Sequence, residues 1–167
     1  MSKRPIVKEV AGLIYRNRMT QYAIAAMSRL AELYPEPDSR VSAVQIATDR
    51  NLPRPVVAKV LSVLAQAGLV RGAPGPGGGY RLARPPGEIS LHDVVVLFES
   101  DNDVDCPFGP GWCGNNTPCP LHDSLMRLKK MAIDHLQHTH FDVFTDERDP
   151  DVAGLLKGPA AAASDRH

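Results

Sequence analysis

The sequence predicts a mainly α-helical protein with one small β-hairpin, and three observations carry this prediction. Apolar residues recur at helical spacing in three stretches before residue 68. A glycine-rich turn between two short runs follows over residues 69–86, as expected of a hairpin. A longer helical pattern occupies residues 118–140. A chain of 167 residues can bury its own core, so we expect one domain with an appended helical segment.

The first predicted helices lie in the N-terminal third of the chain. Residues 1–18 have the pattern of a short amphipathic helix. A second helix is expected from Thr20, which can act as its N-cap, to about residue 34. Its inward stripe would comprise Ile24, Met27, Leu30 and Tyr34.

A tight turn separates the next two predicted helices. Ser42 and Gln45 have the spacing of a capping box, which opens a helix over residues 42–49. A further helix runs from residue 53 to about 67, and Gly68 is expected to end it. The apolar side of that helix comprises Val57, Val60, Leu61 and Leu64.

The predicted hairpin completes a known plan. Residues 69–71 form the outgoing strand, residues 72–79 the turn and residues 80–82 the return strand. Three helices with a short turn before the third, followed by a hairpin, make up the winged helix-turn-helix plan of DNA-binding proteins. In that plan the third helix enters the major groove, and the hairpin, or wing, lies along the DNA backbone or the minor groove. The glycine-rich turn lacks the Lys-Ser/Thr pair of a phosphate-binding loop, so we exclude a nucleotide site there.

The charge of the chain is divided between its two halves. Residues 1–85 hold 13 Lys and Arg against 5 Asp and Glu, whereas residues 86–167 hold 6 against 14. The net charges of these halves are therefore +8 and −8, although the whole chain is neutral. A basic first half suits a polyanionic partner, since phosphates supply most of the non-specific affinity of nucleic-acid complexes.

Three cysteines and one histidine form a candidate metal site. Cys106, Cys113, Cys119 and His122 are separated by six, five and two residues. Clustered cysteines in a chain without a secretory leader favour a metal over disulfides, and we expect a cytoplasmic protein. Structural zinc usually takes paired ligands two to four residues apart, whereas looser spacing in a glycine-rich loop favours an iron–sulfur cluster. Both metals remain open from the spacing alone.

The second half of the chain is expected to pair two copies. Ser90 is the expected cap of a helix over residues 91–99. Thr117 and Pro118 are expected to begin the longest helix, over residues 118–140, which would place Cys119 and His122 on one face. Apolar residues at intervals of three and four along this helix predict a homodimer seam of Leu121, Leu125, Leu128, Ala132 and Leu136.

Four segments of the chain resemble the IscR/NsrR/RirA-type transcriptional regulators. The resemblance covers residues 18–140 and is carried by residues 18–23, 45–47, 60–70 and 75–82. The Gly-Leu-Val sequence that ends the third helix, followed by the Gly-Gly-Gly-Tyr of the wing, is rather specific. The resemblance implies a dimeric winged-helix transcription factor.

The same resemblance implies a cofactor. Family members hold an iron–sulfur cluster on three cysteines between the post-wing helix and the dimer helix, where Cys106, Cys113 and Cys119 stand. One branch takes its fourth ligand from a histidine three residues after the last cysteine, and His122 matches that position. We expect a 2Fe–2S cluster, with 4Fe–4S as the alternative.

The expected function is sequence-specific binding of a double-stranded DNA operator. We expect a repressor whose DNA affinity is controlled by a cluster that senses iron, nitric oxide or redox state. The candidate contacts to base edges, or to the phosphates beside them, are Arg54, Lys59 and Ser62. The candidate phosphate contacts are Thr20, Gln21, Arg71, Arg81 and Arg84.

Two other functions remain open, namely a zinc-stabilised DNA-binding protein without a sensing role and an iron–sulfur electron carrier. No nucleophile–base pair has the spacing of a catalytic site, so we expect neither an enzyme nor a small-molecule substrate. No membrane association is expected, because no apolar run approaches the length of a span. The expected divisions are an N-terminal extension (1–18), the winged helix-turn-helix domain (19–86), the cluster loop with the dimerisation helix (87–144) and a disordered tail (145–167).

Overall fold

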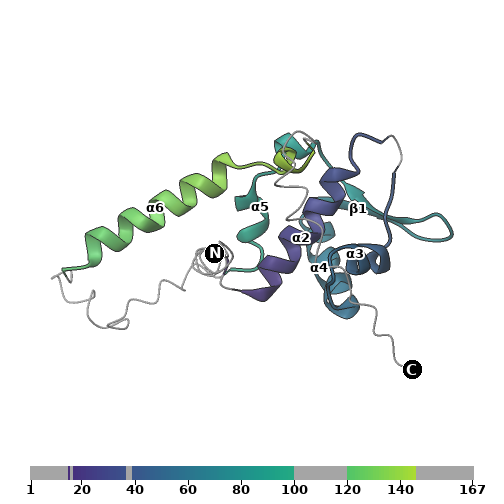
Figure 1. The fold of residues 1–167 in the computed structure, drawn as a ribbon, viewed down its shortest axis with the longest axis horizontal. Coiled ribbons are helices and arrows are strands. Elements are labelled where there is room, and N and C mark those ends of the chain that lie inside the picture. Colours follow the sequence, from purple (N-terminus) through teal and green to yellow (C-terminus); the bar gives the residue numbers. More distant parts are fainter. Residues whose placement is uncertain (1–14, 16, 37–38, 100–119, 146–167) are drawn as a thin grey trace, which may run out of the picture.

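The computed structural model describes residues 15, 17–36, 39–99 and 120–145, and these residues confirm the predicted fold class. The described part is mainly helical with a two-stranded antiparallel hairpin. Figure 1 shows α6 extending away from the other helices at one end of the molecule, with the hairpin at the other end. In chain order the elements are α2 (Arg18–Glu32), α3 (Ala43–Asp49), α4 (Arg54–Gln66), β1 (Val70–Ala73), β2 (Gly79–Leu82), η1 (Pro86–Glu88), α5 (Leu91–Val95), α6 (His122–His138) and η2 (Phe141–Phe144).

Helix α2 begins three residues earlier than predicted. Its N-cap is Asn17, whose side-chain oxygen accepts a hydrogen bond of 2.9 Å from the backbone N–H of Met19. The prediction that Thr20 caps this helix is therefore wrong, and Thr20 lies buried in its first turn. Tyr34 does not point inward either, because the helix ends at Glu32 and 42% of Tyr34 is exposed. Most of the inward face is formed by small residues, which let the neighbouring helices approach closely.

Helices α3 and α4 match the sequence patterns closely. The Ser42 hydroxyl accepts a hydrogen bond from the N–H of Gln45 (3.1 Å), as in a capping box. The Gln45 side chain completes no box, because it donates to Asp49 Oδ1 at 2.6 Å instead. Helix α4 ends before Gly68, whose φ of +72° is the left-handed conformation common after a helix. The predicted apolar face of α4 is fully buried, in Val57, Val60, Leu61 and Leu64.

The wing is joined to the segment that precedes α3. Strands β1 and β2 pair in an antiparallel register that sets Val70 opposite Leu82. Val41 adds an isolated bridge to Tyr80, with hydrogen bonds of 3.1 and 2.8 Å between their backbones. Gly79 allows this close approach, since a Cβ there would lie 2.8 Å from the Val41 backbone. The wing is therefore held against the start of the helix-turn-helix unit.

The base of α6 is attached to the same core. Helix α5 is shorter than the predicted 91–99, and Ser90 caps it in a full capping box with Asp93. The chain after α6 pairs with the chain before α5, where Leu91 N–H donates to the Thr139 carbonyl (2.8 Å). Phe141, just after this pairing, is fully buried. This attachment leaves the rest of α6 projecting from the core (Figure 1).

Helix α6 begins later than predicted. Pro120 and Leu121 form a turn, and the first helical residue is His122. Proline is tolerated both in a turn and in the first turn of a helix, so Pro120 alone could not show from the sequence where this helix begins. The expected cap and first residue, Thr117 and Pro118, lie outside the described residues.

Two predicted segments lie almost entirely outside the residues that the structure describes. The helix expected over residues 1–18 falls on undescribed positions up to residue 14, and the tail expected from residue 145 does so from residue 146. Among the residues that are described, no helix is long and apolar enough to cross a membrane.

Candidate nucleic-acid interface

The polar face of α4 lies opposite its buried face. Arg54, Lys59 and Ser62 are all exposed, as the sequence pattern predicted. The four apolar residues on the other side hold the helix against α2 and α3, so its polar face is presented to solvent as one surface. The first turn of α4 has no side-chain cap, Pro55 there has no backbone N–H, and the N–H of Val56 donates to the Pro53 carbonyl at 3.0 Å.

The turn between α3 and α4 fixes the angle of these two helices. Asn51 adopts a positive φ of 52°, a conformation that asparagine tolerates better than most residues. The next residue, Leu52, donates its backbone N–H to the Ala47 carbonyl at 2.8 Å and packs against the core. Helix α4 is therefore set at a defined orientation to α3.

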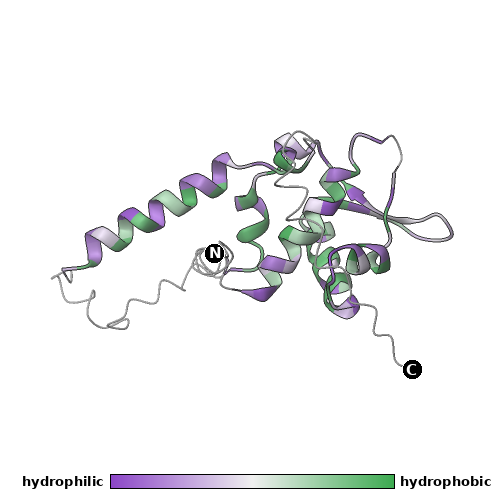
Figure 2. Cartoon of the chain, in the orientation of Figure 1, coloured by the Kyte–Doolittle hydropathy of each residue, from purple (hydrophilic) through white to green (hydrophobic). Residues whose placement is uncertain are grey.

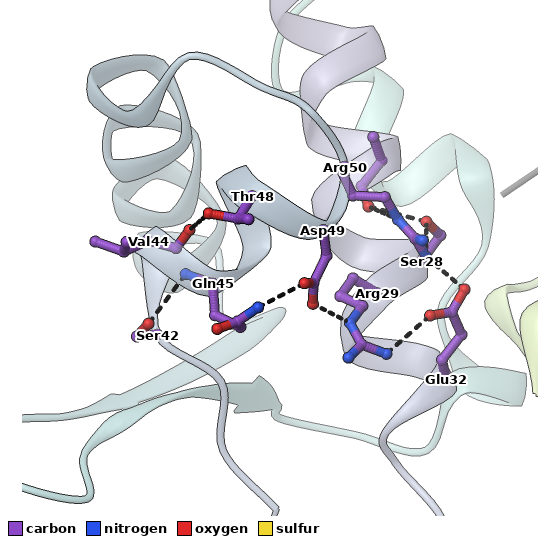
Figure 3. A network of polar contacts seen from close by, with 10 residues as sticks. Ser28, Arg29, Glu32, Ser42, Val44, Gln45, Thr48, Asp49 and Arg50 are labelled. Carbon is purple, nitrogen blue, oxygen red and sulfur yellow. Dashed lines mark hydrogen bonds and ion pairs between the residues drawn. The ribbon is translucent and has the colours of Figure 1, made fainter. Parts of the chain in front are cut away.

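A network of charged side chains joins α3 to α2, and the sequence analysis did not find it (Figure 3). Arg29 donates to Asp49 Oδ2 at 2.7 Å and to Glu32 Oε2 at 3.1 Å. Burial lowers the pKa of Arg29, but its hydrogen bonds to Asp49 and Glu32 outweigh that effect and raise the pKa above its usual value. Arg50 bonds Glu32 and the Ser28 hydroxyl, and it also donates to the Ala25 carbonyl.

The signal for this network was partly present in the sequence. Arg29 and Glu32 stand three residues apart on one helix, and Asp49 and Arg50 are adjacent at the end of the next. Their meeting depends on how α2 crosses α3, which no local pattern encodes. The network fixes the helix pair on which α4 rests.

The wing carries further basic residues. Arg71 and Arg81 stand directly opposite each other in the β1–β2 register, with Arg71 exposed and Arg81 half-buried. Arg84 follows β2 and is exposed. Arg40, which the sequence analysis missed, is also exposed and directly precedes the residue that pairs with the wing. The polar face of α4 is thus accompanied by four arginines on or beside the wing.

The two residues predicted at the start of α2 differ in their access to a ligand. Gln21 is exposed, and its side-chain amide donates to the Tyr15 carbonyl at 2.9 Å. Thr20 is fully buried, and its hydroxyl donates to Glu99 Oε1 at 2.6 Å. A DNA phosphate cannot reach a buried hydroxyl that is already bonded, so Thr20 is removed from the candidate contacts.

The candidate metal ligands fall mostly outside the described residues. Cys106, Cys113 and Cys119 all lie there, and only His122 is described. His122 is half-exposed at the N-terminal end of α6, the end farther from the wing in Figure 1. Over the described ranges, no group of three or more His, Cys, Asp or Glu side chains is placed to hold a metal ion.

The predicted dimer seam is largely exposed on α6. Leu121 and Leu128 are exposed, Leu128 by 62%, while Leu125 and Ala132 are half-buried. Leu136 is the exception, because it is only 5% exposed and belongs to the core of its own chain. Leu136 therefore anchors the base of α6 and is removed from the candidate interface. Figure 2 shows apolar residues recurring along the projecting helix.

Comparison with a family model identifies the region that carries the similarity. Residues 16–147 match the model of the Rrf2 family, described as an iron-dependent transcriptional regulator. The matched region includes all the helices and both strands described above.

Similar proteins are also described as transcriptional regulators. A Rhodopseudomonas palustris protein described as an HTH-type transcriptional regulator, BadM, is 38% identical over 150 residues, which cover 90% of this chain and 94% of that protein. The transcriptional regulator IscR of Vibrio vulnificus is 30% identical over 71% of this chain and 69% of its own length. Among solved structures, T. potens IscR has a TM-score of 0.62 at 27% identity, covering 78% of this chain and 85% of that one.

Proposed function

Because this chain belongs to the Rrf2 family of DNA-binding transcriptional regulators, we propose that it is an operator-specific repressor controlled by an iron–sulfur cluster. Its relatives are regulators of transcription, so the chain is a regulator and not an enzyme. Beyond the family assignment, we propose which residues contact DNA, that the protein is a homodimer, and that it holds a cluster.

The observation that supports the proposed base contacts is the division of α4 into a buried and an exposed face. Its apolar face is fully buried and its opposite face exposes Arg54, Lys59 and Ser62. A recognition helix needs this arrangement, since one side must hold the helix while the other reaches base edges. Arg54 is the candidate guanine reader, because guanidinium groups bond guanine bidentately in the major groove. Gln21, Arg71, Arg81 and Arg84 are the proposed phosphate contacts.

The observation that supports the homodimer is the exposed apolar stripe of α6. Within this helix of 17 residues, Leu136 alone is buried by its own chain. Met131, three residues after Leu128, flanks the stripe predicted from sequence and is 66% exposed, whereas Met126 is exposed on another side of the helix. A matching helix from a second copy would cover these side chains and remove their apolar surface from water. Two copies would also present two α4 helices to two half-sites of an operator.

The cluster proposal rests on the donor set. Cys106, Cys113 and Cys119 supply three thiolates and His122 supplies an imidazole, which are ligands that iron–sulfur clusters take in proteins. The described chain stops at the half-buried Glu99 and resumes at Pro120, beside the projecting end of α6. The cysteines therefore belong to the connection between the DNA-binding core and the helix proposed to pair the copies. When bound, the cluster would supply the redox and iron sensitivity, and its ligation would order that connection.

The test is purification without oxygen, followed by iron, sulfide and zinc analysis and an absorption spectrum. We expect a coloured protein with iron and acid-labile sulfide, and loss of most of both in Cys106→Ala, Cys113→Ala or Cys119→Ala. A colourless protein with one zinc per chain would replace the cluster by structural zinc. For the fourth ligand, His122→Ala should alter the spectrum, whereas the matched variant His138→Ala, at the other end of α6, should not.

The regulatory part is tested with an operator fragment. Affinity is measured anaerobically for loaded and cluster-free protein at one salt concentration, and we expect the loaded form to bind more tightly. Allosteric couplings are typically about 1–3 kcal/mol, or about 5- to 150-fold in affinity. Two forms that agree within about twofold would show that the cluster does not control DNA binding.

A further inference from the structure

A cavity of about 380 Å³ lies between the C-terminal end of α2 and the wing. One wall comes from the end of α2 and the chain after it, and includes Leu33 and Tyr34. The other comes from both strands of the wing and includes Arg71, Arg81 and Leu82. Cavities of about 300–1,000 Å³ are the size of small-molecule sites in proteins.

Hydrogen bonds hold both walls in place. The Ser39 hydroxyl donates to the Leu33 carbonyl at 2.6 Å, which turns the chain back after α2. The wing wall is held by the two backbone hydrogen bonds between Val41 and Tyr80. The cavity is therefore built into the fold and does not depend on one side-chain rotamer.

The lining has the chemistry of a site for a small organic anion. Arg71 and Arg81 are paired across the two strands, so their guanidinium groups are supplied by neighbouring positions. Guanidinium groups bind carboxylates through two parallel hydrogen bonds. Glu36 also lines the cavity and offsets part of the positive charge of these two arginines.

The remaining lining suits an apolar body. Tyr34 and Tyr80 contribute rings, and Leu33 and Leu82 contribute aliphatic surface. Tyr34 is 42% exposed although its position on the helical pattern predicted an inward side chain. A ligand that covers this ring would remove apolar surface from water.

We propose that this cavity binds a small organic carboxylate with an apolar body, and that its binding weakens DNA binding by engaging Arg71 and Arg81. The effect on DNA binding rests on the proposed function, in which Arg71 and Arg81 contact DNA phosphates. A carboxylate bound to these guanidinium groups would occupy N–H donors that the phosphates use and would offset their positive charge, so ligand and DNA should compete.

Ligand binding is measured first on the DNA-free protein by calorimetry, with phenylacetate as the probe. We expect saturable binding of phenylacetate, and at least tenfold weaker binding of neutral 2-phenylethanol and of acetate, which lacks the ring. Equal binding of phenylacetate and 2-phenylethanol, or no binding of phenylacetate at millimolar concentration, would overturn the site.

Variants then locate the site. Arg71→Gln should lower phenylacetate affinity by about tenfold or more, because a charge-assisted hydrogen bond is lost. The matched variant Arg84→Gln removes a guanidinium group from beside the wing but not from the cavity lining, and it should stay within twofold. Tyr34→Ala should weaken binding and Tyr34→Phe should restore it. Equal effects of Arg71→Gln and Arg84→Gln would mean that phenylacetate binds elsewhere.

Competition with DNA is measured last, at constant ionic strength with chloride as the reference anion. Saturating phenylacetate should weaken operator binding several-fold in the native chain, and it should have no effect in Tyr34→Ala. Failure to bind any operator would reject the proposed function while leaving the calorimetric result intact. Phenylacetate binding without any change in DNA affinity would reject the competition.

Discussion

Thr20 and Glu99, 79 positions apart in the chain, are joined by a hydrogen bond of 2.6 Å from the threonine hydroxyl to Oε1 of the carboxylate. The same oxygen accepts the backbone N–H of Asn17 at 3.0 Å, and the Asn17 amide donates to the Phe98 carbonyl. The first turn of α2 is therefore fastened to the last described residues before the cysteines. A carboxylate at the N-terminal end of a helix also interacts favourably with the helix dipole.

Replacing Thr20 by valine should lower the free energy of unfolding by about 1–3 kcal/mol, because the half-buried carboxylate of Glu99 loses a donor while the packing volume stays nearly constant. The measurement is a urea unfolding curve. The matched control is Thr48→Val, whose hydroxyl is exposed and bonds only the Val44 carbonyl of its own helix. Control and Thr20→Val curves with the same midpoint would show that the bond to Glu99 contributes nothing.

Two truncations should separate the N-terminal extension from the folded domain. A chain that begins at Tyr15 keeps the Asn17 cap and the tyrosine that packs against the core, so its unfolding curve should match that of the full chain. A chain that begins at Met19 should still fold, but with about 0.5–2 kcal/mol lower stability, because the cap of α2 is lost. Failure of the longer chain to fold would show that residues 1–14 are part of the core.

Two leucines on α6 should have opposite effects on assembly and stability. Leu128→Glu places a charge in the exposed stripe and should convert the proposed dimer to monomer in sedimentation experiments at micromolar concentration. Gln137→Glu adds the same charge to an exposed position of the same helix and should leave the dimer intact. Leu136→Ala should keep the dimer but cost about 2–5 kcal/mol of stability, because it opens a cavity in the core. A dimeric Leu128→Glu protein would contradict the proposed interface.

Arginines on α4 and beside the wing should affect DNA binding differently. Arg54→Ala should cost about 1–3 kcal/mol on the operator and relax preference at the base it contacts. Arg84→Ala should weaken specific and random DNA alike, and it should reduce the slope of log affinity against log salt concentration by about one. Fluorescence anisotropy with both DNAs across a salt series provides these values. If both variants lose affinity equally on specific and random DNA, Arg54 does not read bases.

The elements that could be predicted from sequence are those with a strong local pattern. The apolar positions of α4 recur at helical spacing and are all buried, and the glycine-rich turn between short strands does form a wing. Burial of one helix face and the geometry of a tight turn are decided by neighbours in sequence. Sequence reasoning therefore located the surface that carries the candidate DNA contacts.

The errors arose where a local pattern was ambiguous or where distant residues decide. Asn17 and Thr20 are both residues that cap helices, and the choice depends on Glu99, far along the chain. The same bond removed Thr20 from the predicted DNA contacts. Leu136 continues the apolar stripe of α6, but it lies in the core, at the end of the helix where the chain returns to pair with Ser90 and to bury Phe141. The Arg29–Asp49 ion pair likewise depends on a helix crossing that has no sequence signature.

If the exposed apolar stripe of α6 forms the proposed dimer, the amount of active regulator depends on the concentration of the protein in the cell. Only one of the 17 residues of this helix is buried within its own chain, so in the proposed dimer a second copy would cover the exposed apolar stripe. While monomers predominate, the concentration of the proposed dimer rises with the square of the monomer concentration. Operator occupancy would then respond more steeply than linearly to gene dosage, and a twofold drop in synthesis would reduce dimer about fourfold. Such a regulator could be released from its operator by dilution during growth, before any chemical signal reaches it.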